Sequence, residues 1–99
     1  MTDLSLEWSE QKNAWLRRER GLSFEAVESA IESGGFLDDV PHPNQGKFPG
    51  QRMLVVRIGE QVCIVPYVDD GTRRFLKTIY PSRKAKRIHG GTQHDEQRA

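Results

Sequence analysis

The chain has almost no cysteine and no long apolar stretch. Cys63 is the single cysteine among 99 residues, so no disulfide can form within the chain, which suits a reducing compartment. No apolar run approaches the roughly 18 residues that a membrane-spanning helix needs. The N-terminus is acidic and polar and lacks the basic-then-apolar pattern of a signal peptide. We therefore expect a cytoplasmic protein that does not enter a membrane.

Motifs for metal or nucleophilic chemistry are also missing. His42, His89 and His94 lie in a predicted loop and near the C-terminus, with no Cys/His pair at ligand spacing. Cys63 lies in an apolar run with no activating neighbour, which favours a role in core packing. No glycine-rich phosphate loop and no G-x-S-x-G turn occurs. We expect neither a metal nor a cofactor.

Charge is present in quantity but is unevenly distributed. The net charge is +1, yet residues 1–40 carry four Lys/Arg against nine Asp/Glu. Between Thr72 and Gly91 there are seven Lys/Arg and no acid. Such a segment attracts polyanions, and phosphate contacts dominate nucleic-acid affinity. A basic segment near a chain end is equally compatible with plain solvated surface.

Two helices are predicted in the first third of the chain. Ser9 is placed to cap a helix from Glu10 to about Arg20, which Gly21 terminates. Ser23 is placed to cap a second helix, residues 24–33, whose apolar residues recur at spacings of three and four. Gly34 and Gly35 then stop it.

Strand patterns dominate the remainder. Residues 4–8 alternate apolar and polar, residues 36–40 form a short extended segment, and residues 41–50 are a loop rich in proline and glycine. Residues 51–58, 61–68 and 73–80 predict three strands joined by turns at Gly59-Glu60 and Asp69-Asp70-Gly71. Pro66 implies a strand end, a bulge or an edge position, because proline donates no ladder hydrogen bond.

These elements predict an α+β fold. The two N-terminal helices pack on one face of an antiparallel meander sheet of three to four strands. Ser82 is placed to cap a short basic helix or turn over residues 83–88. Residues 1–89 are expected to form a single domain and residues 90–99 a frayed tail.

The basic segment supplies the groups that RNA cleavage without metal requires. A side chain must assist proton transfer and cations must stabilise the charge on phosphorus, and a requirement for the 2′-OH selects RNA over DNA. We nominate Lys77 for phosphate contact, Tyr80 for proton transfer and Arg57 for transition-state charge, with Glu7 as a possible base. The alternative is a solvated strand face whose side-chain stems pack on the sheet. Composition alone favours that alternative.

A resemblance to a known family favours RNA cleavage over a solvated strand face. Three segments, Leu6-Glu7-Trp8-Ser9-Glu10-Gln11-Lys12-Asn13, Arg20-Gly21-Leu22-Ser23-Phe24-Glu25 and Ile79-Tyr80-Pro81-Ser82-Arg83-Lys84-Ala85, occur in the order in which similar segments occur in BrnT-type toxins. The chain resembles these toxins of type II toxin–antitoxin modules over roughly residues 6–88. The family has a RelE-like ribonuclease fold.

The resemblance implies a metal-independent endoribonuclease that is neutralised by a cognate antitoxin. Arg83 and Lys84 match the family's Arg-Lys pair, for which we expect phosphate binding and charge stabilisation. Lys12 and Asn13 match a Lys-Asn pair of the family's first helix. We expect Lys12 to contact RNA, and Asn13 is equally compatible with a structural role. Further RNA contacts are expected from the remaining cations of the basic segment: Arg73, Arg74, Lys86 and Arg87.

Two features depart from the family. Glu19-Arg20 precede Gly21 where the family commonly has Lys-His, and the loop around His42 is long. His42 is either a replacement acid–base group or a turn residue, and the turn interpretation is favoured. A non-catalytic module that binds RNA or a protein partner remains the alternative function. Open outer strands are compatible with a homodimer or with a toxin–antitoxin hetero-oligomer.

Overall fold

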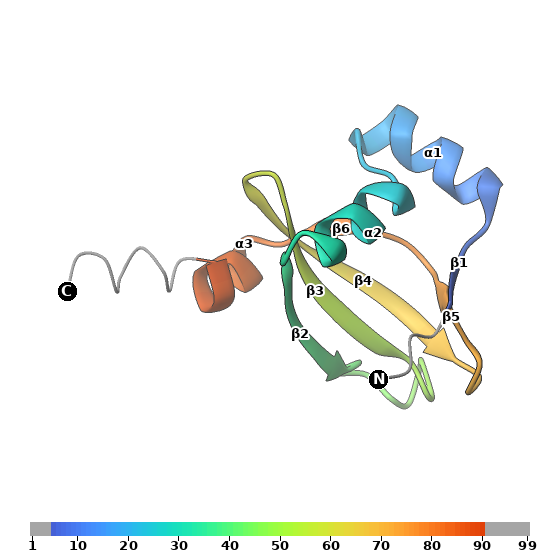
Figure 1. Cartoon of the computed structure of the whole chain (residues 1–99). Helices are drawn as coiled ribbons and strands as arrows, with labels where there is room; N and C mark the ends of the chain where they lie inside the picture. Colours follow the sequence, from blue (N-terminus) through green and yellow to red (C-terminus); the bar gives the residue numbers. More distant parts are fainter. Residues whose placement is uncertain (1–4, 91–99) are drawn as a thin grey trace.

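The computed structural model describes residues 5–90 as one α+β unit (Figure 1). The elements are β1 (Ser5–Glu7), α1 (Glu10–Arg20), α2 (Phe24–Glu32), β2 (Phe36–Pro41), β3 (Arg52–Ile58), β4 (Gln61–Asp69), β5 (Arg73–Leu76), β6 (Tyr80–Pro81), α3 (Arg83–Ala85) and the π-helical turn η1 (Lys86–Gly90). The predicted α+β class is confirmed. Residues 91–99 of the predicted tail, and with them His94, lie outside the described residues.

The sheet is larger than predicted and is not purely antiparallel. Its strand order is β1-β5-β4-β3-β2, and β6 pairs with β4 beyond the end of β5. β1 runs parallel to β5, whereas the other neighbours are antiparallel. The expectation of three to four antiparallel strands was therefore wrong, because the short β1 and β2 join the two sides of the meander.

The predicted helix boundaries follow from the caps. The Ser9 side chain accepts a hydrogen bond from the backbone of Lys12, and Gly21 ends α1 in the left-handed conformation at φ 67°. The Ser23 side chain caps α2 in the same way by accepting from Ala26. Local sequence thus suffices to place both helices.

A buried asparagine joins the two helices. The Asn13 amide oxygen accepts from the backbone N–H of Phe24 at 2.9 Å, and its amide nitrogen donates to Glu25 at 2.9 Å. The bond from Asn13 is the main reason why the pKa of the Glu25 carboxyl lies below its usual value. Asn13 is fully buried, so its role here is structural.

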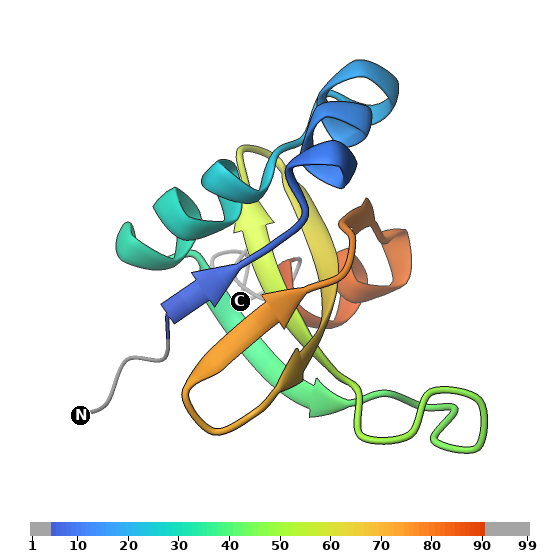
Figure 2. The same ribbon diagram turned by 90° about the vertical axis from the view of Figure 1, so that its right-hand side faces the viewer.

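Helices cover both faces of the sheet, as Figure 2 shows with α1 and α2 on one side and α3 on the other. The main core lies under α1 and α2 and includes the following buried residues: Leu16, Leu22, Phe24, Val27, Leu54, Val56, Cys63, Val65, Tyr67, Leu76 and Ile79. A second, smaller core joins Val55, Val62 and Ile64 to Ala85 of α3. We call these two sides of the sheet the helix face and the α3 face.

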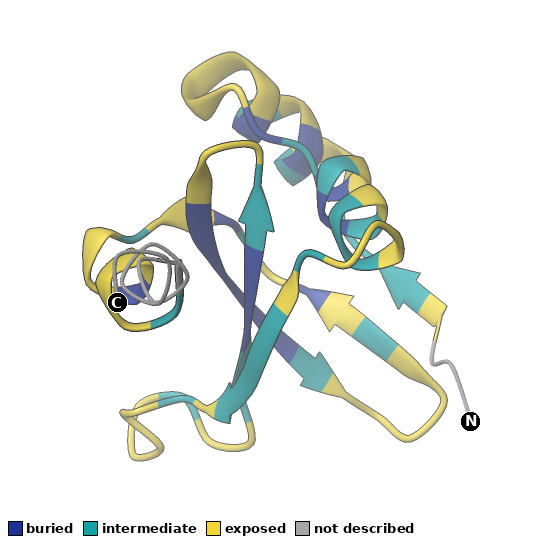
Figure 3. Ribbon diagram, turned by 60° about the vertical axis from the view of Figure 1, so that its left-hand side comes forward, coloured by how far each residue is buried: buried dark blue, intermediate teal, exposed yellow. Residues whose placement is uncertain are grey.

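Burial follows this layering. Figure 3 shows the buried positions concentrated on the central strands, while the outer turns of α1 and α3 and the loop ends are exposed. Side chains alternate along a strand, so each central strand contributes to both cores.

Proline explains why the last predicted strand is broken. Pairing of β4 with β5 ends at Tyr67 opposite Leu76 and resumes with β6 at Ile64 opposite Tyr80. Pro66 lies between these points and has no N–H to donate, although its carbonyl accepts from the backbone of Lys77 at 2.8 Å. The chain detours through residues 77–79 at this position.

This detour changes the face on which side chains lie. A continuous strand would place Ile79 with Phe75 and Tyr80 with Leu76. Instead Ile79 is buried beside Leu76 in the main core, and Tyr80 lies opposite Ile64 on the α3 face. The alternation of a continuous strand therefore holds through Leu76 and fails at Ile79 and Tyr80.

Candidate nucleic-acid interface

The basic end of the chain is held on the α3 face by backbone and apolar contacts. The backbone N–H of Ser82 donates to the carbonyl of Val62 at 2.9 Å, and the Ser82 side chain caps α3 by accepting from Ala85. Ala85 then packs on Val62 and Ile64. Because Ala85 points inward, the charged residues of the turn lie outside.

Four predicted RNA-contacting residues are exposed on this turn. They are Arg83, Lys84, Lys86 and Arg87. Tyr80, which pairs with Ile64 just before α3, is 37% exposed. Further along β4 on the same face, Phe75 lies opposite Val68, and the Lys77 ammonium is 5.4 Å from the centre of the Phe75 ring. Phe75 is itself 36% exposed. The α3 face therefore combines cations with two accessible aromatic rings.

Acidic neighbours divide the predicted cations into two classes. Arg73 lies 3.2 Å from Glu7 and 3.8 Å from Asp70, and Arg74 lies 3.6 Å from Asp69. Within residues 5–90, by contrast, no carboxylate lies within 4.0 Å of the following side chains: Lys77, Arg83, Lys84, Lys86 and Arg87. Among the described residues, therefore, no acidic side chain neutralises the second class of cations.

Two nominated residues lie away from the α3 face, and a third lies on it but two strands from β5. Arg74 lies on the helix face, where its guanidinium is 4.9 Å from the Tyr67 ring centre. Lys12 lies on α1, with its ammonium 4.4 Å from the Trp15 ring centre. Arg57 lies on β3 opposite Val62, which places it on the α3 face, and β4 separates it from β5.

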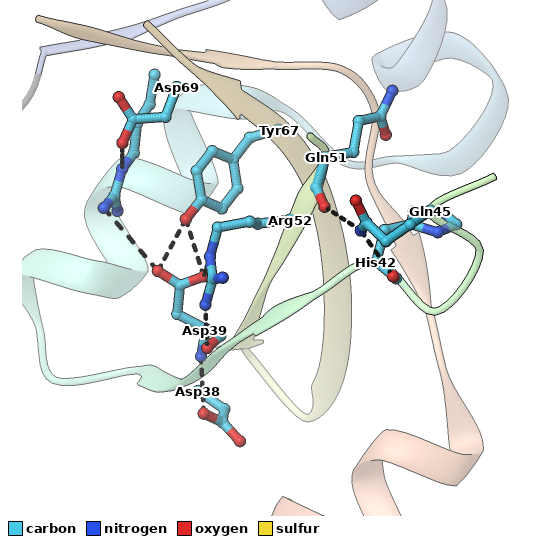
Figure 4. Close-up of polar contacts among 9 residues, drawn as sticks. Asp38, Asp39, His42, Gln45, Gln51, Arg52, Tyr67 and Asp69 are labelled. Carbon is cyan, nitrogen blue, oxygen red and sulfur yellow. Dashed lines mark hydrogen bonds and ion pairs between the residues drawn. The ribbon is translucent and has the colours of Figure 1, made fainter. Parts of the chain in front are cut away.

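Two other candidates have local partners. Glu7, the possible base, is on the α3 face but is paired with Arg73. The His42 Nδ1 atom accepts from the backbone of Asn44 at 3.0 Å, and its ring lies 4.5 Å from that of Phe48. Gln45 donates to the carbonyls of His42 and Gln51, as drawn in Figure 4. These bonds support the interpretation of His42 as a turn residue.

Sequence reasoning missed a polar cluster on the helix face. The buried Tyr67 hydroxyl donates to the Asp39 carboxylate at 2.8 Å, and Arg52 Nε donates to the same carboxylate at 3.1 Å (Figure 4). Burial, and then the bond to Asp39, raise the pKa of Tyr67, while Asp39 raises that of Arg52. Arg74 Nη2 is 3.9 Å from Asp39.

This cluster links four strands rather than presenting charge. Asp39, Arg52, Tyr67 and Arg74 come from β2, β3, β4 and β5 respectively. The two arginines are balanced by Asp39 and Asp69. No local signal predicts the cluster, since its members are far apart in the chain and Tyr67 sits in an apolar alternation.

In comparisons with known proteins, no family description, curated protein or solved structure matches this chain. Among residues 5–90, no group of three or more His, Cys, Asp and Glu side chains is arranged to hold a metal ion. In the same part of the chain, no helix has the length and apolar character needed to cross a membrane.

Proposed function

We propose that this chain is a metal-independent endoribonuclease toxin of a type II toxin–antitoxin system, which acts in the cytoplasm and is neutralised by a cognate antitoxin. The observation that supports the proposal is a set of cations around Tyr80 and α3 that have no acidic partner among residues 5–90. The resemblance of the segments around Lys12, Gly21 and Arg83 to BrnT-type toxins supports it.

In the proposed reaction the 2′-oxygen of RNA attacks the adjacent phosphorus while the bond to the 5′-oxygen breaks. The 2′ proton leaves to water, and the Tyr80 phenol donates a proton to the departing 5′-oxygen. Lys77, Arg83 and Lys84 stabilise the charge that develops on the phosphate oxygens. The products are a 2′,3′-cyclic phosphate and a 5′-hydroxyl, and no metal takes part.

A cleavage assay in EDTA tests this function. We expect the wild-type chain to cut a labelled single-stranded RNA and to leave the corresponding DNA intact, because DNA lacks the 2′-OH. Tyr80→Phe should slow cutting by roughly 10²–10⁴-fold, the usual contribution of a proton-transfer group. Lys84→Ala should slow it as well, whereas Lys47→Ala, which alters an exposed loop lysine, should not.

The biological part of the proposal has its own test. Induced expression should arrest growth, and co-expression of the neighbouring gene should restore it. Growth at the normal rate, together with RNA that stays intact in the EDTA assay, would rule out the toxin.

A non-catalytic RNA-binding module is the second candidate. The accessible Phe75 ring beside Lys77, and the accessible Tyr80 ring, favour it, because exposed aromatic rings combined with cations bind single strands without any chemistry. Binding of RNA by a wild-type chain that never cuts it would select this module over the nuclease.

A further inference from the structure

A small cavity opens on the α3 face where β1, β5 and β4 meet. Its volume is about 310 Å³, and it is lined by Glu7, Val68, Asp70, Arg73 and Phe75. This volume lies at the lower end of the ~300–1,000 Å³ range of ligand pockets. It suits one flat ring system rather than an extended ligand.

The strand register creates the floor of the cavity. Phe75 pairs with Glu7 on β1 at one side and with Val68 on β4 at the other. The Phe75 ring therefore lies between an acidic side chain and an aliphatic one, with 36% of the residue exposed. In a strand this large ring would normally be covered, and here no described element covers it.

The rim of the cavity is polar but carries both signs of charge. The Arg73 guanidinium lies 3.2 Å from Glu7 and 3.8 Å from Asp70. Two carboxylates beside one guanidinium repel a phosphate. The same arrangement offers hydrogen-bond donors and acceptors side by side, and the edge of a nucleobase requires both.

The Lys77 ammonium, close to the cavity, provides a separate contact for the phosphate of a bound nucleotide. The Lys77 ammonium is 5.4 Å from the centre of the Phe75 ring, and within the described part of the chain no carboxylate lies within 4.0 Å of it. Arg73 precedes Phe75 by two residues in β5, and Lys77 follows Phe75 by two residues, directly after β5 ends. A nucleotide bound here has its base over Phe75 and its phosphate toward Lys77.

We infer that this cavity binds one unpaired nucleobase of an RNA strand, stacked on Phe75, with the Arg73–Glu7 pair at the edge of the base. The inference rests on the proposed function in that it requires the α3 face to bind RNA. A base held in a duplex is stacked between its neighbours and cannot enter, so the site selects single-stranded segments.

The test measures binding by fluorescence anisotropy with the full chain and a labelled 2′-O-methyl RNA strand, which cannot be cut. A second strand has the same backbone but abasic positions. The variants are Phe75→Leu, Phe75→Trp and the matched control Phe36→Leu, since Phe36 is an exposed phenylalanine of β2 at the opposite edge of the sheet. Circular dichroism establishes that each variant is folded.

Phe75→Leu should weaken binding of the base-containing strand by roughly 5- to 100-fold, the range expected for one stacked base. Its affinity for the abasic strand should equal that of the wild type. Phe75→Trp should restore binding, and Phe36→Leu should leave it unchanged.

Other outcomes distinguish failure of the nucleobase site from failure of the proposed RNA-binding function. Equal binding of the base-containing strand by wild type and Phe75→Leu would overturn the nucleobase site and leave the RNA-binding face intact. If Phe75→Leu weakened binding of the base-containing and abasic strands equally, the nucleobase site would also be overturned. The same holds if an eight-residue polyglutamate peptide displaced the RNA and the binding of that peptide required Phe75, because the site would then fit an acidic peptide. Failure of the wild type to bind either strand at low salt would end the RNA-binding proposal itself.

Discussion

At the scale of single residues, burial determines the chemistry of Cys63 and Tyr67. Cys63 is fully buried in the main core, and this burial raises the pKa of its thiol from 9.0 to about 11. A thiol that keeps its proton is a poor nucleophile, so Cys63 is a packing residue, as the apolar run around it suggests. The pKa of Tyr67 is raised for the same first reason.

The raised thiol pKa predicts a loss of stability in alkali. The folded state holds the Cys63 proton up to about pH 11, whereas the unfolded thiol releases it near 9.0. The stabilisation is therefore complete below pH 9 and is lost as the pH rises toward 11. By pH 10.5 the free energy of unfolding should have fallen by about 2 kcal/mol from this group.

Urea unfolding at several pH values measures this loss. Cys63→Ala should cost stability at every pH because it leaves a small cavity, but its stability should decline less between pH 9 and 10.5. If the free energy of unfolding declined equally with pH in the wild type and in Cys63→Ala, the thiol would not contribute to the loss of stability in alkali.

At the scale of elements, caps and turns were predictable whereas the broken strand was not. Ser9, Ser23 and Ser82 each cap the element that follows, and each cap is a contact over three residues. The division of the last strand into β5 and β6 depends instead on Pro66 of a neighbouring strand. Pro66 predicted an irregularity in the sheet, but the sequence did not indicate which neighbouring strand would be interrupted.

A long-range contact holds the detour between β5 and β6. Arg20 Nη1 donates to the carbonyl of Ile79 at 2.7 Å, and the Arg20 guanidinium lies 4.9 Å from the Trp15 ring centre. Tyr80 follows directly. Arg20, which occupies one of the two positions where the resembling family commonly has Lys-His, thus connects α1 to the residue proposed for proton transfer.

Arg20→Ala should loosen this segment without unfolding the chain. We expect faster amide hydrogen exchange over residues 77–82 and slower RNA cutting. The free energy of unfolding should fall by about 1.5–3 kcal/mol, the contribution of a hydrogen bond from a charged group. Arg18→Ala is the matched control, because Arg18 lies on the same helix and pairs with its neighbour Glu19. If the amides of residues 77–82 exchange at the same rate in both variants, Arg20 does not stabilise the segment between β5 and β6.

At the scale of the whole molecule, the acidic first part of the chain neutralises only some of the cations. Glu7 and Asp39 come from the first forty residues and lie beside Arg73 and Arg74. The cations of α3 and η1, together with Lys77, remain on the other side of the sheet from α1 and α2. The net charge of +1 therefore conceals a positive surface.

This surface predicts the salt dependence of RNA binding. With each of its five cations contacting one phosphate, a plot of log affinity against log salt should have a slope of about −3 to −4 for a single strand. The double variant Lys84→Ala/Lys86→Ala should make the slope shallower by about 1.4. Lys47→Ala should leave it unchanged, and an equal change in this control would mean that binding is not localised to the α3 face.

The sequence by itself determined both N-terminal helices, the hairpin turns, the capped basic turn and the position of the basic segment, because short-range hydrogen bonds and apolar periodicity produce them. The tertiary structure decided the parallel pairing of β1 with β5, the face on which Tyr80 lies and which arginines are paired with acids. The Arg73–Glu7 contact spans 66 positions. Such contacts depend on how the chain closes on itself, which no local pattern encodes.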